Sequence, residues 1–249
     1  MQGVKQRARS ARAEESGRSR AKEPIKKAIP LGDSAYGIIK GAIVDCEIDP
    51  GAELTQSELI DRFNLTNAQA RHALVRLTQE GWVRPLPQRG YLVAPLTMKD
   101  LEDIYEMRML IEPPAMRKAA GRINPETRKH LEKLGDADYT PGDRASIRRF
   151  LRSNREFFMI IARCCDNKLL AKTIDQLFDS SNRLLYFSML HSYDSDAVRR
   201  GHQKLVEALV RGDGKEVERL RRAGLDHGKQ AVRRALLSMP SVMDINLIN

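Results

Sequence analysis

Hydrophobic residues between positions 54 and 93 follow two different spacings. Two short stretches repeat every three or four residues, the helical period, and a turn at Asn64 and Leu65 separates them. A third stretch carries apolar residues on both sides of Pro87-Gln88-Arg89-Gly90, which predicts two strands joined by a hairpin tip. The apolar face of the first helix is expected to comprise Leu54, Leu59, Ile60 and Phe63, and that of the second Ala70, Ala73, Leu74 and Leu77.

Polar residues mark where these helices begin and end. Thr55 with Glu58, and Thr66 with Gln69, have the spacing of capping boxes, and Gly81 stands where a left-handed residue ends a helix. Two helices, a short turn and a hairpin outline a winged helix-turn-helix, a DNA-reading unit. A helix pair that serves packing alone is the competing interpretation, which the caps and the hairpin disfavour.

From residue 97 onward the helical period continues almost without a break. Helices are expected near 97–120, 125–134, 143–164, 167–190, 195–211 and 213–238. A further helix before residue 49, capped by Asp33 or Ser34, is expected to have Tyr36, Ile38, Ile39, Ala42 and Ile43 as its apolar residues. Pro113 and Pro114 are expected to kink or interrupt the first of the long helices. Short connections and mixed faces indicate an antiparallel bundle. The predicted fold class is therefore mainly α, with an N-terminal winged helix-turn-helix followed by an all-α antiparallel helical bundle.

Composition divides the chain into four predicted parts. Residues 1–30 hold nine basic and three acidic side chains and few large apolar residues, which predicts a disordered basic tail. Residues 31–95 are expected to form the DNA-binding domain, 96–240 a helical domain for effector binding and dimerisation, and 241–249 a C-terminal tail. The basic tail is either solvated charge or a loose electrostatic arm on DNA.

The remaining composition excludes several classes of protein. The 249-residue chain has 43 basic and 33 acidic residues, and residues 66–91 carry four arginines against one glutamate, which suits a phosphate-facing surface. Cys46, Cys164 and Cys165 have neither the pattern of a disulfide framework nor zinc-finger spacing. No apolar run approaches membrane-spanning length, so we expect a cytoplasmic protein. No nucleophile–base pair, phosphate loop or paired carboxylates predict an enzyme.

The second helix of the pair has one polar face that would meet a DNA groove. Its outward residues near the N-terminus, Asn67 and Gln69, are placed for base edges, and Arg71 and Arg76 for phosphates. His72 and Gln79 belong to the same face. At the hairpin tip, Arg89 is placed for a backbone or minor-groove contact, beside Gly90, which would allow a close approach.

These segments resemble a known family. Residues 36–95 resemble the GntR-type winged helix, and residues 97–238 resemble the all-helical FCD-type effector domain of the FadR subfamily. The resemblance rests on Asp49-Pro50-Gly51-Ala52-Glu53-Leu54, Arg71-His72-Ala73-Leu74-Val75-Arg76-Leu77, Glu80-Gly81-Trp82-Val83, Ile104-Tyr105-Glu106-Met107-Arg108 through Glu112-Pro113, Asn167-Lys168-Leu169-Leu170 and His202 through Asp213. It implies a dimeric transcription regulator on a pseudo-palindromic operator in double-stranded DNA, controlled by a small, often carboxylate, effector in the helical domain.

The DNA-reading helix departs from the family pattern. Where the family often has Ser-Arg-Thr-Pro-Val-Arg, this chain has Thr66-Asn67-Ala68-Gln69-Ala70-Arg71, so an asparagine replaces a base-reading arginine. Because Asn favours adenine where Arg favours guanine, we expect an atypical operator. Ser57 stands where some members make an arginine contact, and Thr66 and Ala68 complete the expected DNA-binding set.

The metal ligands of many members are mostly missing. The resemblance places an aspartate and three histidines at Asn154, Phe158, His202 and Gly224, so one ligand in four is retained. No metal or other cofactor is therefore expected. A shifted set of His191, His202 and His227 is the alternative.

A metal-free pocket for an acid needs another cation. Arg108 is the first candidate, because a guanidinium binds a carboxylate through two hydrogen bonds, and Arg155 and Arg183 are weaker ones. Each could instead be a surface arginine or part of an ion pair. The expected effector-binding set is Arg108, Asn154, Phe158, Arg183 and His202. The competing function is an effector-independent architectural DNA-binding protein with a degenerate pocket.

Overall fold

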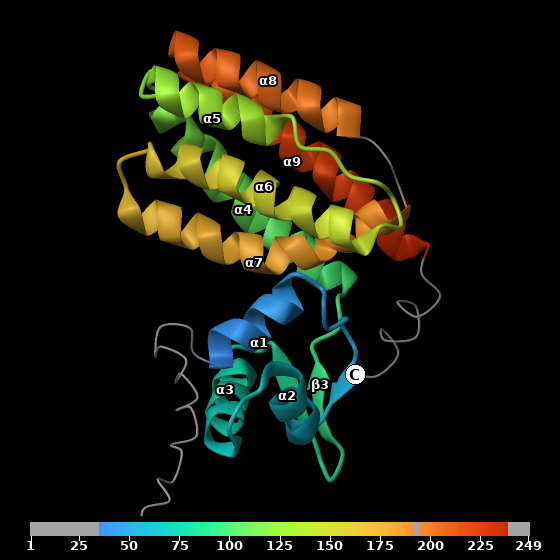
Figure 1. Cartoon of the computed structure of the whole chain (residues 1–249). Helices are drawn as coiled ribbons and strands as arrows, with labels where there is room; N and C mark the ends of the chain where they lie inside the picture. The colour runs from blue at the N-terminus through green and yellow to red at the C-terminus, as the bar shows by residue number, and fades with distance from the viewer. Residues whose placement is uncertain (1–34, 192–194, 239–249) are drawn as a thin grey trace, which may run out of the picture. The chain divides into compact units, whose positions relative to one another are not determined.

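The structure is a computed structural model, and it describes residues 35–191 and 195–238 (Figure 1). The predictions for the two tails, residues 1–30 and 241–249, lie outside these ranges. The elements in chain order are α1 (Ala35–Val44), β1 (Glu53–Leu54), α2 (Gln56–Phe63), α3 (Asn67–Gln79), β2 (Val83–Leu86), β3 (Gly90–Val93), α4 (Met98–Ala119), α5 (Pro125–Gly135), α6 (Arg144–Arg163), α7 (Lys168–His191), α8 (Ser195–Arg211) and α9 (Gly214–Leu237). The predicted fold class is confirmed.

Both capping boxes form at the start of the helix-turn-helix. The Glu58 amide donates to Thr55 Oγ1 at 3.2 Å, and the Thr55 amide donates to Glu58 Oε2 at 2.7 Å. In α3 the Gln69 amide donates to Thr66 Oγ1 at 3.3 Å, and the Thr66 amide donates to Gln69 Oε1 at 2.9 Å. Asn64 ends α2 in the left-handed conformation, with φ of 51°. Local polar residues therefore determine where these helices begin and turn.

The wing is a three-stranded antiparallel sheet rather than a simple hairpin. Strand β3 lies between β1 and β2, with Leu86 opposite Gly90 at the tip. The short strand β1 is absent from the sequence prediction, which assigns Leu54 to the apolar face of α2. That assignment is wrong, because Leu54 pairs with Tyr91. A two-residue strand is too short to show an alternating pattern, and its partner decides its conformation.

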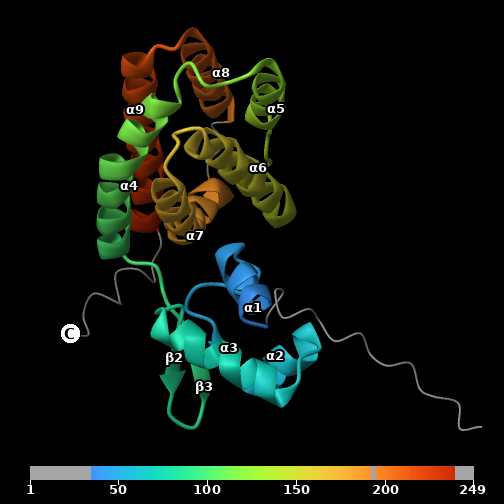
Figure 2. The same cartoon turned by 90° about the vertical axis from the view of Figure 1, so that its left-hand side faces the viewer.

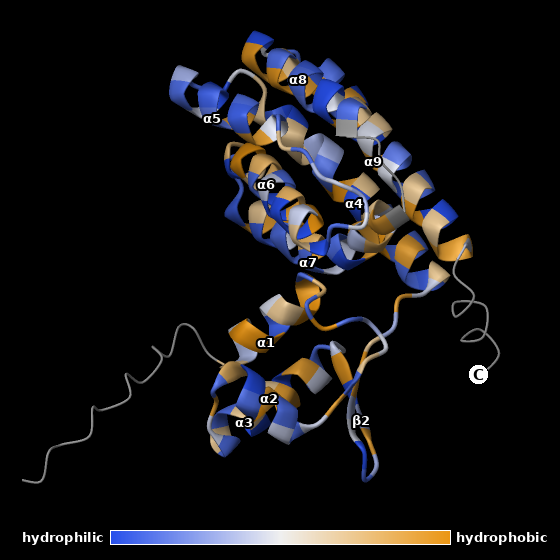
Figure 3. Ribbon diagram, turned by 45° about the vertical axis from the view of Figure 1, so that its right-hand side comes forward, coloured by the Kyte–Doolittle hydropathy of each residue, from blue (hydrophilic) through white to orange (hydrophobic). Residues whose placement is uncertain are grey.

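The six predicted helices of the bundle all form, close to their expected limits. Figures 1 and 2 both show α4 and α9 side by side. In Figure 3, hydrophobic and hydrophilic residues alternate along α5 and α8. The apolar faces enclose a core around Met116, Phe157 and Phe178. Amphipathic helices of this kind are stabilised mainly by burying that face.

Pro113 and Pro114 were predicted to kink or interrupt this helix, and the interruption does not occur, because α4 is one helix that includes both prolines. Pro113 has no N–H for the carbonyl of Met109, which would lose its hydrogen bond. The guanidinium of Arg222 on α9 donates to that oxygen at 3.4 Å. A residue from another helix thus compensates for the group that the proline removes.

The glycine at the wing tip leads to a prediction. Gly90 has φ of 107°, and a Cβ there would collide with the backbone carbonyl of Leu54 in β1. We expect Gly90→Ala to lower the free energy of unfolding by more than about 2 kcal/mol, measured by urea denaturation. Gly51→Ala is the matched control, because Gly51 has φ of 78° but open space around its Cβ position. Equal losses in the two variants would contradict the steric explanation.

Candidate nucleic-acid interface and ligand cavity

The outward face of α3 is a continuous stripe that no other described element covers. It consists of exposed side chains three or four residues apart, namely Ala68, Arg71, His72, Val75 and Gln79. Val75 is 51% exposed, although valine normally avoids water. The sequence interpretation missed this residue, but its position in the stripe was a usable signal. In a major groove its methyl groups suit the methyl group of thymine.

The first turn of α3 has fewer free polar groups than the sequence suggests. Oε1 of Gln69 is occupied by the capping box, which leaves only the amide NH₂ for a base. Gln56 on α2 donates to Oδ1 of Asn67 at 3.4 Å and so links the two helices. Thr66 serves as the N-cap, whereas Ser57 is exposed on the first turn of α2.

Two of the predicted phosphate-binding arginines already have partners. The Arg76 guanidinium lies 3.7 Å from the ring centre of Tyr36, and its Nε donates to Glu80 at 3.0 Å. Arg89 pairs with Glu53 across the wing at 3.0 Å. Among the described residues, Arg71 and Arg84 have no ion-pair partner, and both are exposed. These two side chains are therefore the more available cations on this domain.

Gly90 has a structural role that the sequence interpretation did not foresee. A Cβ at this position would lie too close to the backbone carbonyl of Leu54. The missing side chain thus makes room for β1. The position of Arg89 at the tip still follows from the tight turn, in which Gln88 has φ of 62°.

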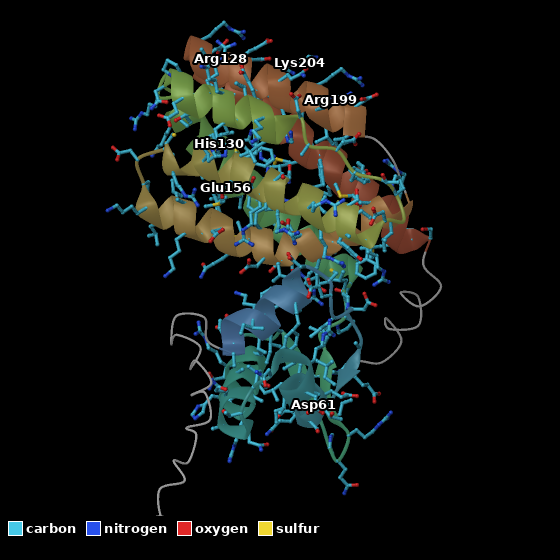
Figure 4. The ribbon with its side chains drawn as sticks, viewed as in Figure 1. Asp61, Arg128, His130, Glu156, Arg199 and Lys204 are labelled. Carbon is cyan, nitrogen blue, oxygen red and sulfur yellow. The ribbon has the colours of Figure 1, made fainter. Side chains whose placement is uncertain are left out.

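The bundle contains a cavity of about 360 Å³. Its walls come from α4, α6, α7, α8 and α9, and include four of the five predicted effector-binding residues: Arg108, Asn154, Phe158 and His202. Lys204, labelled on α8 in Figure 4, also lines it. The volume lies within the usual range for small-molecule sites.

Arg183 is the exception among the predicted effector residues. It does not line this cavity but donates to the carbonyl oxygen of Ala94, after the wing. Its guanidinium lies 5.7 Å from the ring centre of Trp82. Arg155 is likewise engaged elsewhere, in ion pairs with Asp175 and Asp179 at 2.7 and 2.6 Å. Two arginines expected near an effector therefore bind other parts of the chain.

Two arginines of a buried charge cluster, Arg108 and Arg221, line the cavity. Glu112 has no exposed surface, and it accepts from Nε of Arg108 at 2.5 Å and from Nε of Arg221 at 2.8 Å. Burial by itself would raise the pKa of Glu112, but the two guanidinium groups hold that pKa below its usual value. The cluster thus holds two positive charges and one negative charge.

The sequence interpretation missed Arg221 and Glu112, although a signal existed. Arg221 lies four residues after Val217 and four before Leu225, so it occupies the apolar face of α9. A charged residue on such a face requires a partner or a ligand. Its guanidinium also lies 3.7 Å from the ring centre of Phe158, a cation–π distance.

His202 is held as a neutral ring. It packs against Phe157 with ring centres 4.3 Å apart, and Nδ1 lies 3.4 Å from the carbonyl oxygen of Gly135. A carbonyl only accepts, so Nδ1 carries the proton and Nε2 remains an acceptor. Burial lowers the pKa of His202 to about 4. The ring therefore adds no positive charge at neutral pH.

The four positions at which the family resemblance implies metal ligands carry other chemistry here. Asn154, Phe158 and Gly224 all line the cavity with His202. Within residues 35–191 and 195–238, no three His, Cys, Asp or Glu side chains come together as a metal site. His227 also lines the cavity, while the side chain of His191, the third member of the shifted set, lies outside the described residues.

Comparison with known families decides the identity of the chain. The model of the FCD domain matches residues 103–227, just over half of the sequence, and that of the bacterial regulatory proteins of the gntR family matches residues 31–93. The chain belongs to the GntR family. This GntR protein is a transcriptional regulator with a DNA-binding helix-turn-helix and an effector-binding type of domain, and not an enzyme.

Individual relatives agree with this assignment. The GntR protein is 28% identical to the HTH-type transcriptional repressor RspR of Escherichia coli K12, over 82% of this chain and 90% of the relative. It is 22% identical to the regulator YdhC of Bacillus subtilis, over 74% and 83% of the two chains. The E. coli McbR/YncC structure has the same fold, with a TM-score of 0.69 and 20% identity over 83% of this chain and 99% of that one. No described helix is long and apolar enough to cross a membrane.

The neutral His202 leads to a pH prediction. Its pKa rises from about 4 in the folded state to about 6.5 on unfolding, so protons favour the unfolded chain. The contribution of neutral His202 to the free energy of unfolding is fully present above pH 6.5 and is lost as the pH falls toward 4. Between pH 7.5 and 5 we expect His202 to account for a loss of about 2 kcal/mol in the free energy of unfolding.

The measurement is urea unfolding of the wild type and of His202→Gln at both pH values. The variant should show a smaller loss on acidification than the wild type. His130→Gln is the control, because His130 is exposed on α5, as labelled in Figure 4. An unchanged pH dependence in His202→Gln would show that His202 is not the titrating group.

Proposed function

We propose that this GntR protein is a cytoplasmic repressor that binds a pseudo-palindromic operator as a homodimer and responds to a small carboxylate metabolite. In this proposal residues 31–95 read the DNA, and residues 96–240 hold the effector and form the dimer. No metal takes part. The observation that carries it is the cavity wall in which Arg108 and Arg221 share the single carboxylate of Glu112.

The charge balance of this wall favours an anionic ligand. Two guanidinium groups and one carboxylate leave one positive charge on a largely buried surface, which is costly without a counter-ion. Nε of each arginine is directed to Glu112, and no hydrogen bond joins the Nη atoms of Arg108 to a described residue. A ligand carboxylate is the natural acceptor for such planar donors.

The rest of the cavity indicates the shape of the ligand. Phe158, Leu185 and Leu205 supply apolar walls, and the Asn154 side chain makes no hydrogen bond to a described residue. A compact molecule with one acidic group, an apolar body and one further polar group fits this lining. Oδ1 and the NH₂ of a ligand-facing Asn154 offer both an acceptor and donors.

A shared hydrophobic cluster gives a route from the cavity to the DNA-binding part. Phe150 and Met189 line the cavity, and both pack in a cluster with Cys46, which is fully buried. Cys46 belongs to the segment between α1 and β1. A ligand that shifts Phe150 or Met189 must therefore disturb the packing of that segment.

Ion pairs attach the same segment to α6. Arg152 pairs with Asp45 at 2.8 Å, and Arg144 pairs with Asp49 at 3.0 Å. Asn154 and Phe158 lie on α6 as well, on its cavity side. A rotation or shift of α6 upon ligand binding would thus change both the cavity wall and the support of the winged helix.

Repression is proposed from the similarity to RspR. The architectural alternative has weaker support. RspR, a repressor, matches across both the DNA-binding part and the bundle. An effector-independent architectural protein would have no use for a cavity of about 360 Å³ beside an uncompensated buried cation. The proposed operator contacts come from Ser57, Thr66, Asn67, Ala68, Gln69, Arg71, His72, Val75, Arg76, Arg89 and Gly90.

Selection of genomic fragments by the purified full chain, at about 0.15 M salt, tests operator binding. We expect a two-fold symmetric sequence to be enriched. Arg71→Ala should weaken its binding by about tenfold and reduce the salt dependence by about one phosphate contact. Arg128→Ala removes the same charge from α5, far along the chain, and should change neither. Enrichment of no sequence would favour the architectural alternative.

Carboxylate binding is tested with succinate and benzoate, each beside its uncharged amide. We expect a carboxylate, and not its amide, to raise the melting temperature and to change operator affinity in fluorescence anisotropy. Asn154→Ala should weaken that response by about tenfold, since one buried hydrogen-bonding group is lost. Gln176→Ala, an exposed amide on α7, is the matched control. Responses to amides equal to those of the acids would contradict the charge argument.

A further inference from the structure

Helix α4 has an outer stripe that the bundle leaves uncovered. We define the α4 stripe by its exposed residues, Asp103, Glu106, Met107, Leu110, Pro114, Arg117 and Lys118. At 100° per residue these positions fall within about 120° of the helix circumference. The opposite face, with Leu101, Tyr105 and Met116, is buried. In Figure 2, no other helix lies on the outer side of α4.

We propose that the α4 stripe is the contact surface with a second copy of this chain, and that the two α4 helices cross antiparallel at Leu110. The inference deepens the proposed homodimer by assigning its interface, and it rests on that part of the proposed function. It does not depend on the operator sequence or on the effector.

The centre of the α4 stripe is apolar, and packing within the described chain does not account for these apolar residues. Leu110 is 64% exposed and Met107 is 44% exposed, and Pro114 extends the same surface. Neither Leu110 nor Met107 belongs to a described hydrophobic cluster of the protein. Neighbouring exposed apolar residues on one helix face are typical of an interaction surface.

The charges of the stripe identify the partner. Asp103 and Glu106 precede Leu110, whereas Arg117 and Lys118 follow it. Asp103 and Arg117 are each seven residues from Leu110, on opposite sides. When an identical helix is placed antiparallel over Leu110, the acidic half of each copy faces the basic half of the other. A two-fold contact requires such self-complementarity, and a parallel arrangement would place like charges together.

An ion pair between Asp103 and Arg117 cannot form within one chain. Asp103 and Arg117 are fourteen residues apart in one helix, or about 21 Å along its axis. Within the chain, Lys99 pairs with Asp103 at 2.5 Å, and Glu218 pairs with Arg117 at 3.3 Å. Asp103 and Arg117 are themselves more than half exposed in these pairs. Exposed ion pairs contribute little, which leaves the two side chains available to a partner.

The α4 stripe and the cavity lie on opposite faces of α4. Arg108 and Glu112 flank Leu110 along α4 and point to the buried side. A ligand that reorients these two groups acts on the same helix that pairs with the second copy. The two-fold interface and the effector cavity would therefore share one structural element.

Sedimentation equilibrium of the full chain without DNA tests the inference. We expect the wild type to dimerise, and Leu110→Glu to weaken dimerisation by about a hundredfold, since two carboxylates would be buried at the centre. Leu169→Glu makes the same change at a residue that is 71% exposed at the start of α7, and it should have no effect. Circular dichroism checks that each variant is folded.

Charge reversal gives a second, independent test. Asp103→Arg and Arg117→Asp should each weaken dimerisation by about tenfold, because each places like charges opposite one another twice per dimer. The double variant restores opposite charges and should return to within about threefold of the wild type. The antiparallel arrangement would be overturned if the loss of dimer affinity in the double variant equalled the combined losses of the two single variants.

Failure of the interface is distinguishable from failure of the proposed function. If the wild type and the Leu110→Glu variant dimerise equally well, the α4 stripe is not the interface, but the proposed homodimer stands. A wild type that stays monomeric overturns both the stripe and the homodimer. Fragment selection still reports operator binding in either case.

Discussion

The carboxylate of Glu112 is the group on which the organisation of the bundle depends. It is fully buried, and it binds guanidinium groups from α4 and α9, which places a fixed polar link in the core. A single buried carboxylate cannot neutralise two arginines, so the link carries excess positive charge. That charge lies at the wall of the cavity, where the proposed anionic ligand would bind. In this proposal, stability and ligand choice both depend on the same three side chains.

Helix α4 combines functions that usually belong to separate elements. Its inner face supplies Arg108 and Glu112, and its outer face carries the exposed Leu110. The helix continues through Pro113, and Arg222 on α9 donates to the carbonyl oxygen of Met109 that the proline leaves without its helical partner. Helix α9 contributes both Arg222, which binds the Met109 carbonyl, and Arg221, which binds Glu112. The α4–α9 pair is therefore a frame, with the proposed ligand on its inner side and the proposed second chain on its outer side.

The segment that follows α1 connects this frame to the DNA-reading part. Cys46 packs beside Phe150 and Met189, and Asp45 and Asp49 pair with arginines of α6. The coupling thus combines a close-packed apolar contact, which tolerates little displacement, with exposed ion pairs, which are individually weak. Such a contact is expected to have discrete arrangements rather than to deform gradually.

The sequence by itself determined the features that depend on near neighbours. Thr66 and Gln69 cap α3 because they stand three residues apart, and the six long helices follow from their apolar period. Tertiary structure decided what distant residues make together. Glu112 meets Arg221 across 109 positions, and the short strand β1 exists because β3 pairs with it. Arg183 was a weaker candidate than Arg108 in the sequence, and the structure shows that it binds the chain after the wing. Local hydrogen-bonding patterns recur at fixed spacing, whereas burial and charge pairing depend on the packing of whole helices.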